Sequence, residues 1–158
     1  MQSGLRLALY QPDMAPNTGA MMRLCACFGV GLDIIEPCGF VLNDPRMRRA
    51  GMDYMEHVAY ARHASWNDFT AQASGRRLVL LTTKAAMPYY DFKFRGDDIL
   101  LVGQESAGVP DEIHSQVQAR LVVPMQPGLR SLNVAMSAAI VLSEALRQSG
   151  GFYEPGSR

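Results

Sequence analysis

The sequence predicts an α/β domain in which a mostly parallel sheet is flanked by helices. Short apolar runs of strand length alternate with segments of helical periodicity along the chain. Several of these runs are continuously apolar, which is typical of strands buried on both faces of a sheet. The chain has 158 residues, of which 48% are hydrophobic and 19% charged, so it can form one domain with a full hydrophobic core.

The N-terminal part is predicted to form a strand, a helix and a second strand. Leucines alternate with other residues over 5–9, the pattern of a strand. A helix is expected over 17–28, with Asn17 as its N-cap and glycines at its end. The second strand is short, over 32–35, and a proline stops it.

Capping residues predict the starts of two further helices. Asp44 is followed by Pro45, a cap with proline at the first helical position. Ser65 has Asp68 three residues later, which resembles a capping arrangement.

The C-terminal half contains three continuous apolar runs and a long helical pattern. Strands are expected over 78–82, 99–102 and 121–123. A final helix is expected over 132–148, where apolar residues recur at spacings of three and four. Alanines along this helix allow a neighbouring helix to pack closely.

Composition limits the classes of function. No apolar run approaches the roughly 20 residues that span a bilayer, and the N-terminus lacks the features of a signal peptide. A cytoplasmic location and no membrane partner are therefore expected. Cys25, Cys27 and Cys38 lack metal-ligand spacing and make a disulfide framework improbable, so no metal is expected and the thiols are interpreted as core-facing. Cys25 and Cys27 should point to different faces of their helix.

The formal net charge is zero, so any nucleic-acid site must arise from local clustering. The candidate cluster contains Arg46, Arg48 and Arg49. Four further residues would extend the cluster: Arg62, His63, Arg76 and Arg77. The alternative interpretation is a solvated helix face.

Two strand–loop–helix junctions near the C-terminal end predict a ligand pocket. The segment Gly103–Pro110 follows one apolar strand, and Val122–Met125 leads through Arg130–Ala135 into the last helix. Exposed backbone N–H groups at such junctions bind ligands. The first loop lacks both the dinucleotide glycine spacing and a Walker lysine.

These two segments resemble the C-terminal signature of the SPOUT (α/β-knot) RNA methyltransferases. The N-terminal motifs that share the resemblance are Asn17–Gly19, Arg23–Ala26, Ile34–Pro37 and Arg48–Tyr54. The resemblance is closest to the small members that methylate the ribose 2′-hydroxyl of the tRNA wobble nucleotide, cytidine or uridine 34. It implies a single domain over 1–158, a homodimer, and a deep trefoil knot that lies with the donor site within about 78–148.

The resemblance also implies that the pocket binds S-adenosyl-L-methionine (SAM), the methyl donor. The residues that it places against SAM are Leu81, Thr82, Gly103, Gln104, Glu105, Gly108, Val123, Met125, Ser131 and Leu132. Gly103 would let the backbone approach the ligand closely. Glu105 would bond the donor or hold its own loop.

Four residues are implied in catalysis by the resemblance: Asn17, Arg23, Ser131 and Asn133. Arginine is a poor general base, so Arg23 is interpreted as holding a phosphate and stabilising the developing alkoxide. Asn17 would orient the ribose or Arg23. The alternative is structural: Asn17 and Ser131 cap helices, Arg23 is a surface charge, and Asn133 is a polar residue of a first helical turn.

The expected RNA partner is the anticodon stem-loop of tRNA. Arg46, Arg48, Arg49 and Tyr54 are the candidate contacts, and Tyr54 could stack on a base. Three alternatives remain: methylation of another tRNA position or of rRNA, a non-catalytic RNA-binding knotted protein, and a small-molecule α/β enzyme.

Overall fold

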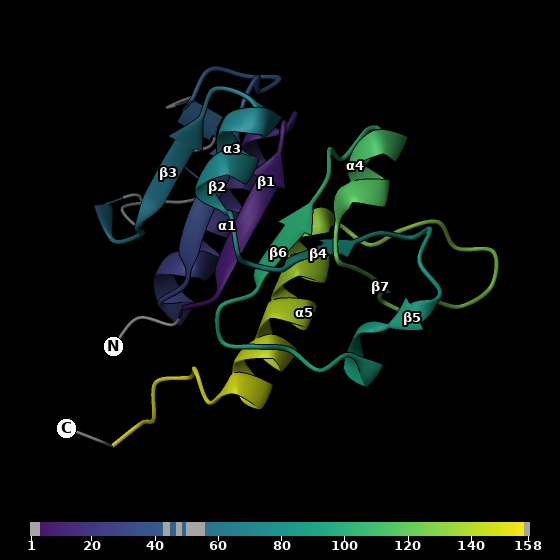
Figure 1. The fold of residues 1–158 in the computed structure, drawn as a ribbon. Helices are drawn as coiled ribbons and strands as arrows, with labels where there is room; N and C mark the ends of the chain where they lie inside the picture. The colour runs from purple at the N-terminus through teal and green to yellow at the C-terminus, as the bar shows by residue number, and fades with distance from the viewer. Residues whose placement is uncertain (1–3, 43–44, 47–48, 50–55, 157–158) are drawn as a thin grey trace.

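The protein is a three-layer α/β structure, as the sequence predicts (Figure 1). The computed structural model describes residues 4–42, 45–46, 49 and 56–156. Its strands are β1 (Arg6–Tyr10), β2 (Gly31–Ile35), β3 (Tyr60–His63), β4 (Leu78–Leu81), β5 (Met87–Pro88), β6 (Ile99–Val102) and β7 (Ala119–Val122). Its helices are α1 (Ala15–Phe28), α3 (Trp66–Gln72), α4 (Asp111–Gln116), α5 (Val134–Ser149) and the 3₁₀ helix η2 (Tyr89–Asp91).

Within the described residues the sheet has seven strands in the order β3-β2-β1-β6-β4-β7-β5. Every pair of neighbouring strands is parallel. Leu9 of β1 and Leu81 of β4 both align with Val102 of β6. The carboxyl ends of these central strands therefore lie side by side at one edge of the sheet, where open parallel sheets bind ligands.

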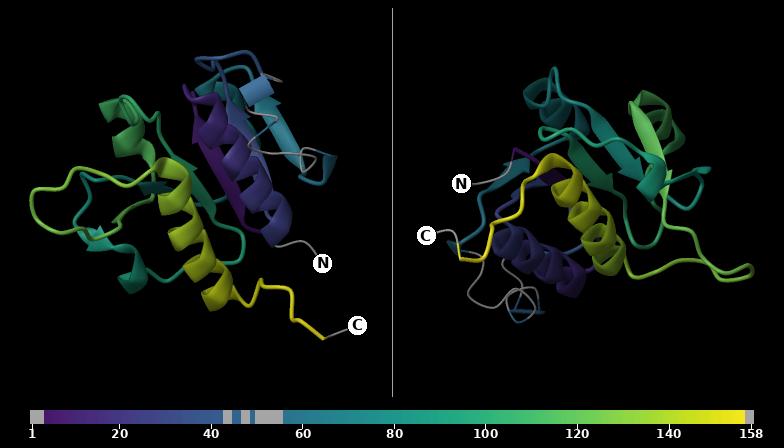
Figure 2. Two further views of the ribbon diagram at one scale, coloured as in Figure 1. Left: turned by 180° about the vertical axis from the view of Figure 1, so that it is seen from behind. Right: turned by 90° about the horizontal axis from the view of Figure 1, so that it is seen from below.

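Helices α1 and α5 cover one face of the sheet, and α3 and α4 cover the other (Figure 2). The core is correspondingly divided into two apolar clusters. Leu7 and Leu9 of β1 face α1 and α5, whereas Ala8 and Tyr10 face the other side. All four residues of β6 are buried, which explains why the central strands are continuously apolar in the sequence.

Two predicted helix starts require correction. Helix α1 begins at Ala15 with Met14 in the N-cap position, so Asn17 lies inside its first turn and is not the cap. Pro16 occupies the first turn, where its missing N–H costs no hydrogen bond. The cap of α5 is Asn133, whose side chain accepts hydrogen bonds from two backbone N–H groups, so the capping role interpreted for Ser131 is wrong.

The predicted end of α1 and start of α3 are confirmed, whereas the predicted cap Asp44 lies outside the described residues. Ser65 caps α3 by accepting a hydrogen bond from the Asp68 N–H at 3.1 Å. Gly29 ends α1 in the left-handed conformation, with φ of 67°. Strand β3 was not predicted because its sequence has no apolar run, and β5 has only two residues, too few for a pattern.

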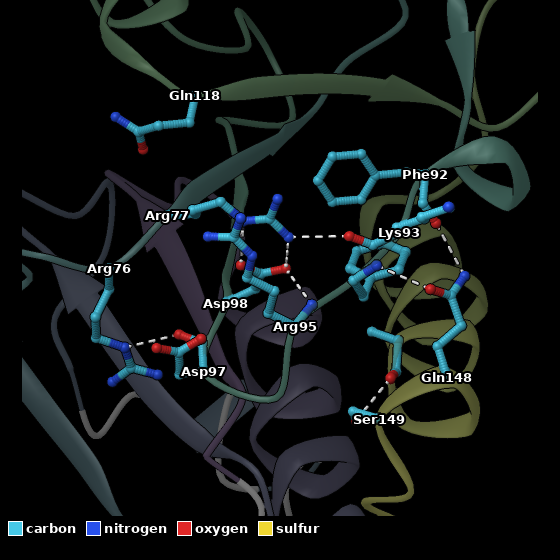
Figure 3. Close-up of polar contacts among 12 residues, drawn as sticks. Arg76, Arg77, Phe92, Lys93, Arg95, Asp97, Asp98, Gln118, Gln148 and Ser149 are labelled. Carbon is cyan, nitrogen blue, oxygen red and sulfur yellow. Dashed lines mark hydrogen bonds and ion pairs between the residues drawn. The ribbon is translucent and has the colours of Figure 1, made fainter.

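A polar cluster joins the segment before β6 to its neighbours (Figure 3). The Arg77 guanidinium donates to both carboxylate oxygens of Asp98, at 2.8 and 2.7 Å, and Asp98 is 1% exposed. At the end of α5, the Gln148 side chain accepts from Phe94 N–H and donates to the Phe92 carbonyl. These bonds fix the return of the chain from β5 to β6 against the C-terminal helix.

The cysteines are free thiols in three different environments. Cys25 is buried and Cys27 exposed, which confirms that they lie on different faces of α1. The interpretation of all three as core-facing is therefore wrong for Cys27. Burial raises the pKa of Cys25 to about 12 and that of Cys38 to about 11. No helix in the described part of the chain has the length and apolar character needed to cross a bilayer.

Candidate functional site

A cavity of about 460 Å³ lies at the carboxyl ends of β6, β4 and β7. Three segments provide most of its lining, 80–83, 102–109 and 122–134, and the start of α1 contributes Met14 and Asn17. The volume falls within the range of small-molecule sites, about 300–1,000 Å³. All ten residues expected to bind the donor line this cavity, as do Asn17, Ser131 and Asn133 of the four expected catalytic residues.

The loop after β6 is a tight turn that closes on itself. Gln104 and Gly108 exchange two backbone hydrogen bonds, at 3.0 and 2.9 Å. A Cβ on Gly103 would stand 2.5 Å from the carbonyl carbon of Gly108, so only glycine fits this position. Gly108 has a φ of 65°, a conformation that glycine adopts without a steric cost. The turn therefore holds its backbone close to the cavity.

This loop is attached to the segment that follows β1. Glu105 N–H donates to Asp13 Oδ1 at 3.2 Å, and Asp13 N–H donates in return to Glu105 Oε2 at 3.3 Å. The Ser106 hydroxyl donates to Asp13 Oδ2. The Gln104 side-chain amide contacts Gln11 Oε1 at 3.4 Å. Asp13 thus couples the start of α1 to the glycine-rich loop, and Glu105 holds its own loop as one of its two expected roles requires.

Glu105 is the only ionisable side chain among the described residues that line the cavity. Burial raises its pKa above the ordinary value of 4.5, and a side-chain hydrogen bond shared with Asp13 raises it further. The same hydrogen bond is the main reason that the pKa of Asp13 is lowered. The second oxygen of Glu105, Oε1, is buried and has no hydrogen-bond partner.

Two asparagines connect the helices α1 and α5 at the cavity. Asn133 Oδ1 accepts from the N–H groups of Ala135 and Met136, at 2.9 and 3.3 Å. The Asn133 amide nitrogen then donates to Asn17 Oδ1 at 3.0 Å. Because that oxygen is engaged, the side of Asn17 left for a ligand is its NH₂ group, which contacts Met14 Sδ at 3.8 Å.

The structure does not bring Arg23 to this cavity. Its side chain is exposed on α1, and it is not among the lining residues. Arg23 is six residues beyond Asn17, so it lies about 9 Å further along the helix axis and on a different side. The expectation that both residues reach one site in a single chain is therefore not met.

The four residues proposed to extend the basic cluster all have partners within the fold. Arg62 pairs with Glu36 at 2.8 Å. His63 is buried against Asp33. Arg76 donates to the Asp97 carbonyl at 2.8 Å, and Arg77 pairs with Asp98. Of the remaining candidates, Arg46 and Arg49 are exposed, whereas Arg48 and Tyr54 lie outside the described residues.

Sequence reasoning missed Asp13 and several neutral lining residues, among them Thr83, Ser106 and Ser137. Asp13 belongs to no recognisable motif, and its partner is 92 residues away. The one available signal was its place in the loop between a predicted strand and helix, close to Asn17.

The chain is similar in sequence to a family of RNA methylases and to named tRNA methyltransferases. The model of the SpoU rRNA Methylase family matches residues 4–143. A protein of Beijerinckia indica named tRNA (cytidine(34)-2'-O)-methyltransferase is 60% identical over 91% of this chain and 91% of its own. The Escherichia coli K12 protein of the same name is 40% identical over 92% of this chain and 94% of its own.

Solved structures agree with the sequence relatives. One described as "Structural insights into the 2-OH methylation of C/U34 on tRNA" has a TM-score of 0.88 and 37% identity, covering 91% of this chain and 95% of that one. An AdoMet-bound rRNA methyltransferase from Sinorhizobium meliloti has a TM-score of 0.84 and 26% identity, covering 92% of this chain and 57% of that one.

Proposed function

The chain belongs to the SpoU rRNA methylase family, and we propose that it transfers a methyl group from SAM to the ribose 2′-hydroxyl of nucleotide 34 of tRNA. The observation that carries this proposal is the 60% identity, over nine-tenths of both chains, to a protein named for that reaction on cytidine 34. Modified uridine at the same position is included because a similar structure concerns both C34 and U34.

The cavity suits SAM in size and in chemistry. Leu81, Val123 and Leu132 provide apolar surface for the adenine ring, and backbone groups beside Pro124 provide hydrogen bonds. The close-packed turn at Gly103 provides further backbone contacts. When bound, SAM supplies an electrophilic methyl group on a positively charged sulfur. Among the described residues that line the cavity, only Glu105 has a carboxyl group that would offset this charge.

Asn17, Ser131 and Asn133 orient the ribose. The Asn17 NH₂ group is directed by the bond that its oxygen accepts from Asn133, so it can donate to a ribose oxygen placed at the mouth of the cavity. Asn133 is in turn fixed by the first turn of α5. Ser131 lines the same cavity with an exposed side chain that can reach substrate.

Arg23 acts on the RNA backbone in this proposal. The 2′-hydroxyl must lose its proton during attack, and arginine, with a pKa above about 12, is a poor acceptor for it. Its fixed positive charge can hold a phosphate of the RNA. Stabilising the oxygen as negative charge develops would require Arg23 to reach the reacting ribose, and Arg23 does not line the cavity of its own chain. Because Arg23 is exposed and outside the cavity, RNA must extend over α1 to meet it.

The proposal extends to the C-terminal knot, within a single domain over residues 1–158 and with knot and donor site within about 78–148. After β4 the chain runs out to the edge strand β5, then returns to β6 between β1 and β4. The returning segment is bonded to the end of α5 through Gln148. Threading of the C-terminal segment through this loop is consistent with that arrangement and is an exception to the usual rule.

We also propose a homodimer that binds the anticodon stem-loop in the cytoplasm. Met136 and Ile140 are 61% and 38% exposed on α5, one turn apart, and form an apolar stripe suited to a second copy. Arg46 and Arg49, with Arg48 and Tyr54 outside the described residues, are the proposed RNA contacts. The double variant Met136→Glu/Ile140→Glu should be monomeric in light scattering, and a dimer that persists would contradict this interface.

A synthetic anticodon stem-loop tests the reaction directly. Labelled SAM is supplied with two RNAs that are identical except that one carries 2′-deoxyribose at nucleotide 34. We expect label only in the RNA with the 2′-hydroxyl. Equal labelling of both RNAs would show that the methylated atom lies elsewhere. Arg23→Ala should abolish transfer while leaving the SAM dissociation constant nearly unchanged.

A further inference from the structure

We propose that the Asp13–Glu105 carboxyl pair makes the cavity select the cationic methyl donor over the product that remains after transfer. Asp13 is a positioning residue in this proposal, because it acts through Glu105 and does not line the cavity. The inference rests on the proposed function, since it takes SAM as the donor and S-adenosylhomocysteine as the product.

The geometry joins the two carboxyl groups closely. Each residue donates its backbone N–H to the carboxylate of the other, at 3.2 and 3.3 Å, so the two side chains are held together from both sides. Ser106 supplies a further donor to Asp13. The Asp13 carboxylate therefore accepts from two donors, whereas Oε1 of Glu105 is buried and has no hydrogen-bond partner. That oxygen is the unsatisfied hydrogen-bond acceptor of the pair.

A shared proton satisfies the pair when no cation is present. Two carboxylates that are both ionised repel each other, so one of them binds a proton more readily than an isolated group. Burial and the bond to Asp13 raise the pKa of Glu105, whereas that of Asp13 is lowered, so the proton belongs to Glu105. In this state Glu105 is neutral and donates a hydrogen bond to Asp13.

Donor and product differ at the sulfur atom. SAM has a sulfonium with a positive charge, and the product has a neutral thioether, while the adenosine and amino-acid parts are the same. A cavity tells the two apart most directly by a negative charge near the sulfur. Glu105 is the only described lining residue that can carry one.

The other described side chains that line the cavity are neutral. The end of β4 contributes Leu81 and Thr82, the start of α1 contributes Asn17, and the loop before α5 contributes Ser131 and Asn133. Asp13 is the only titratable side chain that contributes to the pKa shift of Glu105. The preference for the donor is therefore set by this pair.

The sign of the pH dependence follows. A bound cation favours the ionised form of Glu105, so SAM binds best above the raised pKa of this group and more weakly as pH falls through it. The product lacks that charge and should depend much less on pH. The ratio of SAM affinity to product affinity should therefore decrease as the pH is lowered. The binding of SAM should release protons from Glu105.

Calorimetry with SAM and with S-adenosylhomocysteine tests the proposal between about pH 5 and about pH 7, below the titration of most α-amino groups. As the pH is lowered across this range, Glu105 takes up a proton, and we expect the preference of the unmodified protein for SAM to fall by about tenfold. Glu105→Gln keeps the shape of the side chain but has no charge, so its preference should be small and constant with pH.

Asp13→Asn distinguishes the pair from a lone glutamate. It removes the negative neighbour while Oδ1 can still accept the Glu105 N–H, so the pKa of Glu105 should fall. The preference for SAM should persist, and its decline should move to lower pH. Unchanged product affinity in both variants shows that the loop is intact.

Two outcomes overturn the proposal. A Glu105→Gln variant that prefers SAM as strongly as the unmodified protein would show that Glu105 does not sense the sulfonium. An Asp13→Asn variant with an unshifted pH profile would show that the carboxyls act separately. Failure of the unmodified protein to bind SAM at any pH would instead remove the proposed function itself.

Discussion

Replacing Gly103 by alanine should open the turn that forms one wall of the cavity. The added Cβ would stand 2.5 Å from the Gly108 carbonyl carbon and 2.7 Å from its Cα, both of them backbone atoms. Non-bonded carbon atoms are ordinarily separated by at least about 3.5 Å, so one side of the turn must move by about 1 Å. Overpacking of this kind costs about 1–3 kcal/mol. If SAM binding must restore the native turn, this cost weakens it by about 5- to 150-fold.

Isothermal calorimetry measures the SAM affinity of this variant, and thermal unfolding measures its stability. Gly96→Ala is the matched control, because its Cβ would meet only the Ser149 Cβ at 3.9 Å, an ordinary contact. We expect SAM affinity to be nearly unchanged in the control. A Gly103→Ala protein that binds SAM as tightly as the control would refute the argument that the close packing of Gly103 against the Gly108 backbone shapes the SAM site.

Three further predictions address other parts of the structure. Asn133→Asp keeps an acceptor for the cap of α5, so the free energy of unfolding should change by less than about 0.5 kcal/mol. The variant cannot donate to Asn17, so kcat for methyl transfer should fall at least about tenfold. An unchanged kcat would show that Asn133 does not orient Asn17. Asp98→Ala removes the acidic partner of Arg77, which keeps its bond to the Lys93 carbonyl, and should lower the urea-unfolding free energy by about 3 kcal/mol. A loss below about 0.5 kcal/mol would show that the pair is energetically neutral. In the native protein an alkylating reagent should modify Cys27 readily and Cys25 only after unfolding, as mass spectrometry of labelled peptides can measure; rapid native labelling of Cys25 would contradict its burial.

The central strands could be predicted from the sequence because their burial on both faces leaves a direct mark. Runs such as 99–102 are apolar at every position, and all four residues are buried in the structure. The two cavity loops follow from the same strands, since a loop after a buried parallel strand must lie at the carboxyl edge of the sheet. That relation is why the expected donor-site residues meet at one cavity.

Long-range polar pairs could not be predicted in the same way. Asn17 and Asn133 are separated by 116 positions, and neither shows in its sequence neighbourhood that it contacts the other. The same limit applies to Asp13 and Glu105. Local rules also assigned the N-cap of α1 to Asn17, which is a good capping residue. The helix instead begins earlier, because Pro16 is accommodated in its first turn.

Arginines were the least predictable residues. Arg77 is basic in the sequence, yet it pairs with the buried carboxylate of Asp98, and its guanidinium lies 4.8 Å from the ring centroid of Phe92. Arg76 donates to the backbone carbonyls of Asp97 and Gly4. A charge cluster in sequence therefore indicates an RNA surface only after the acidic and carbonyl partners supplied by the fold have been counted.

Methyl transfer from labelled SAM to total tRNA tests the central claim most directly. The tRNA is taken from a strain that lacks the protein, and nuclease mapping then locates the label. The account predicts 2′-O-methyl label at nucleotide 34 and none when Asn17→Ala replaces the unmodified protein. Label at another nucleotide, or no label in tRNA although SAM is bound, would contradict it.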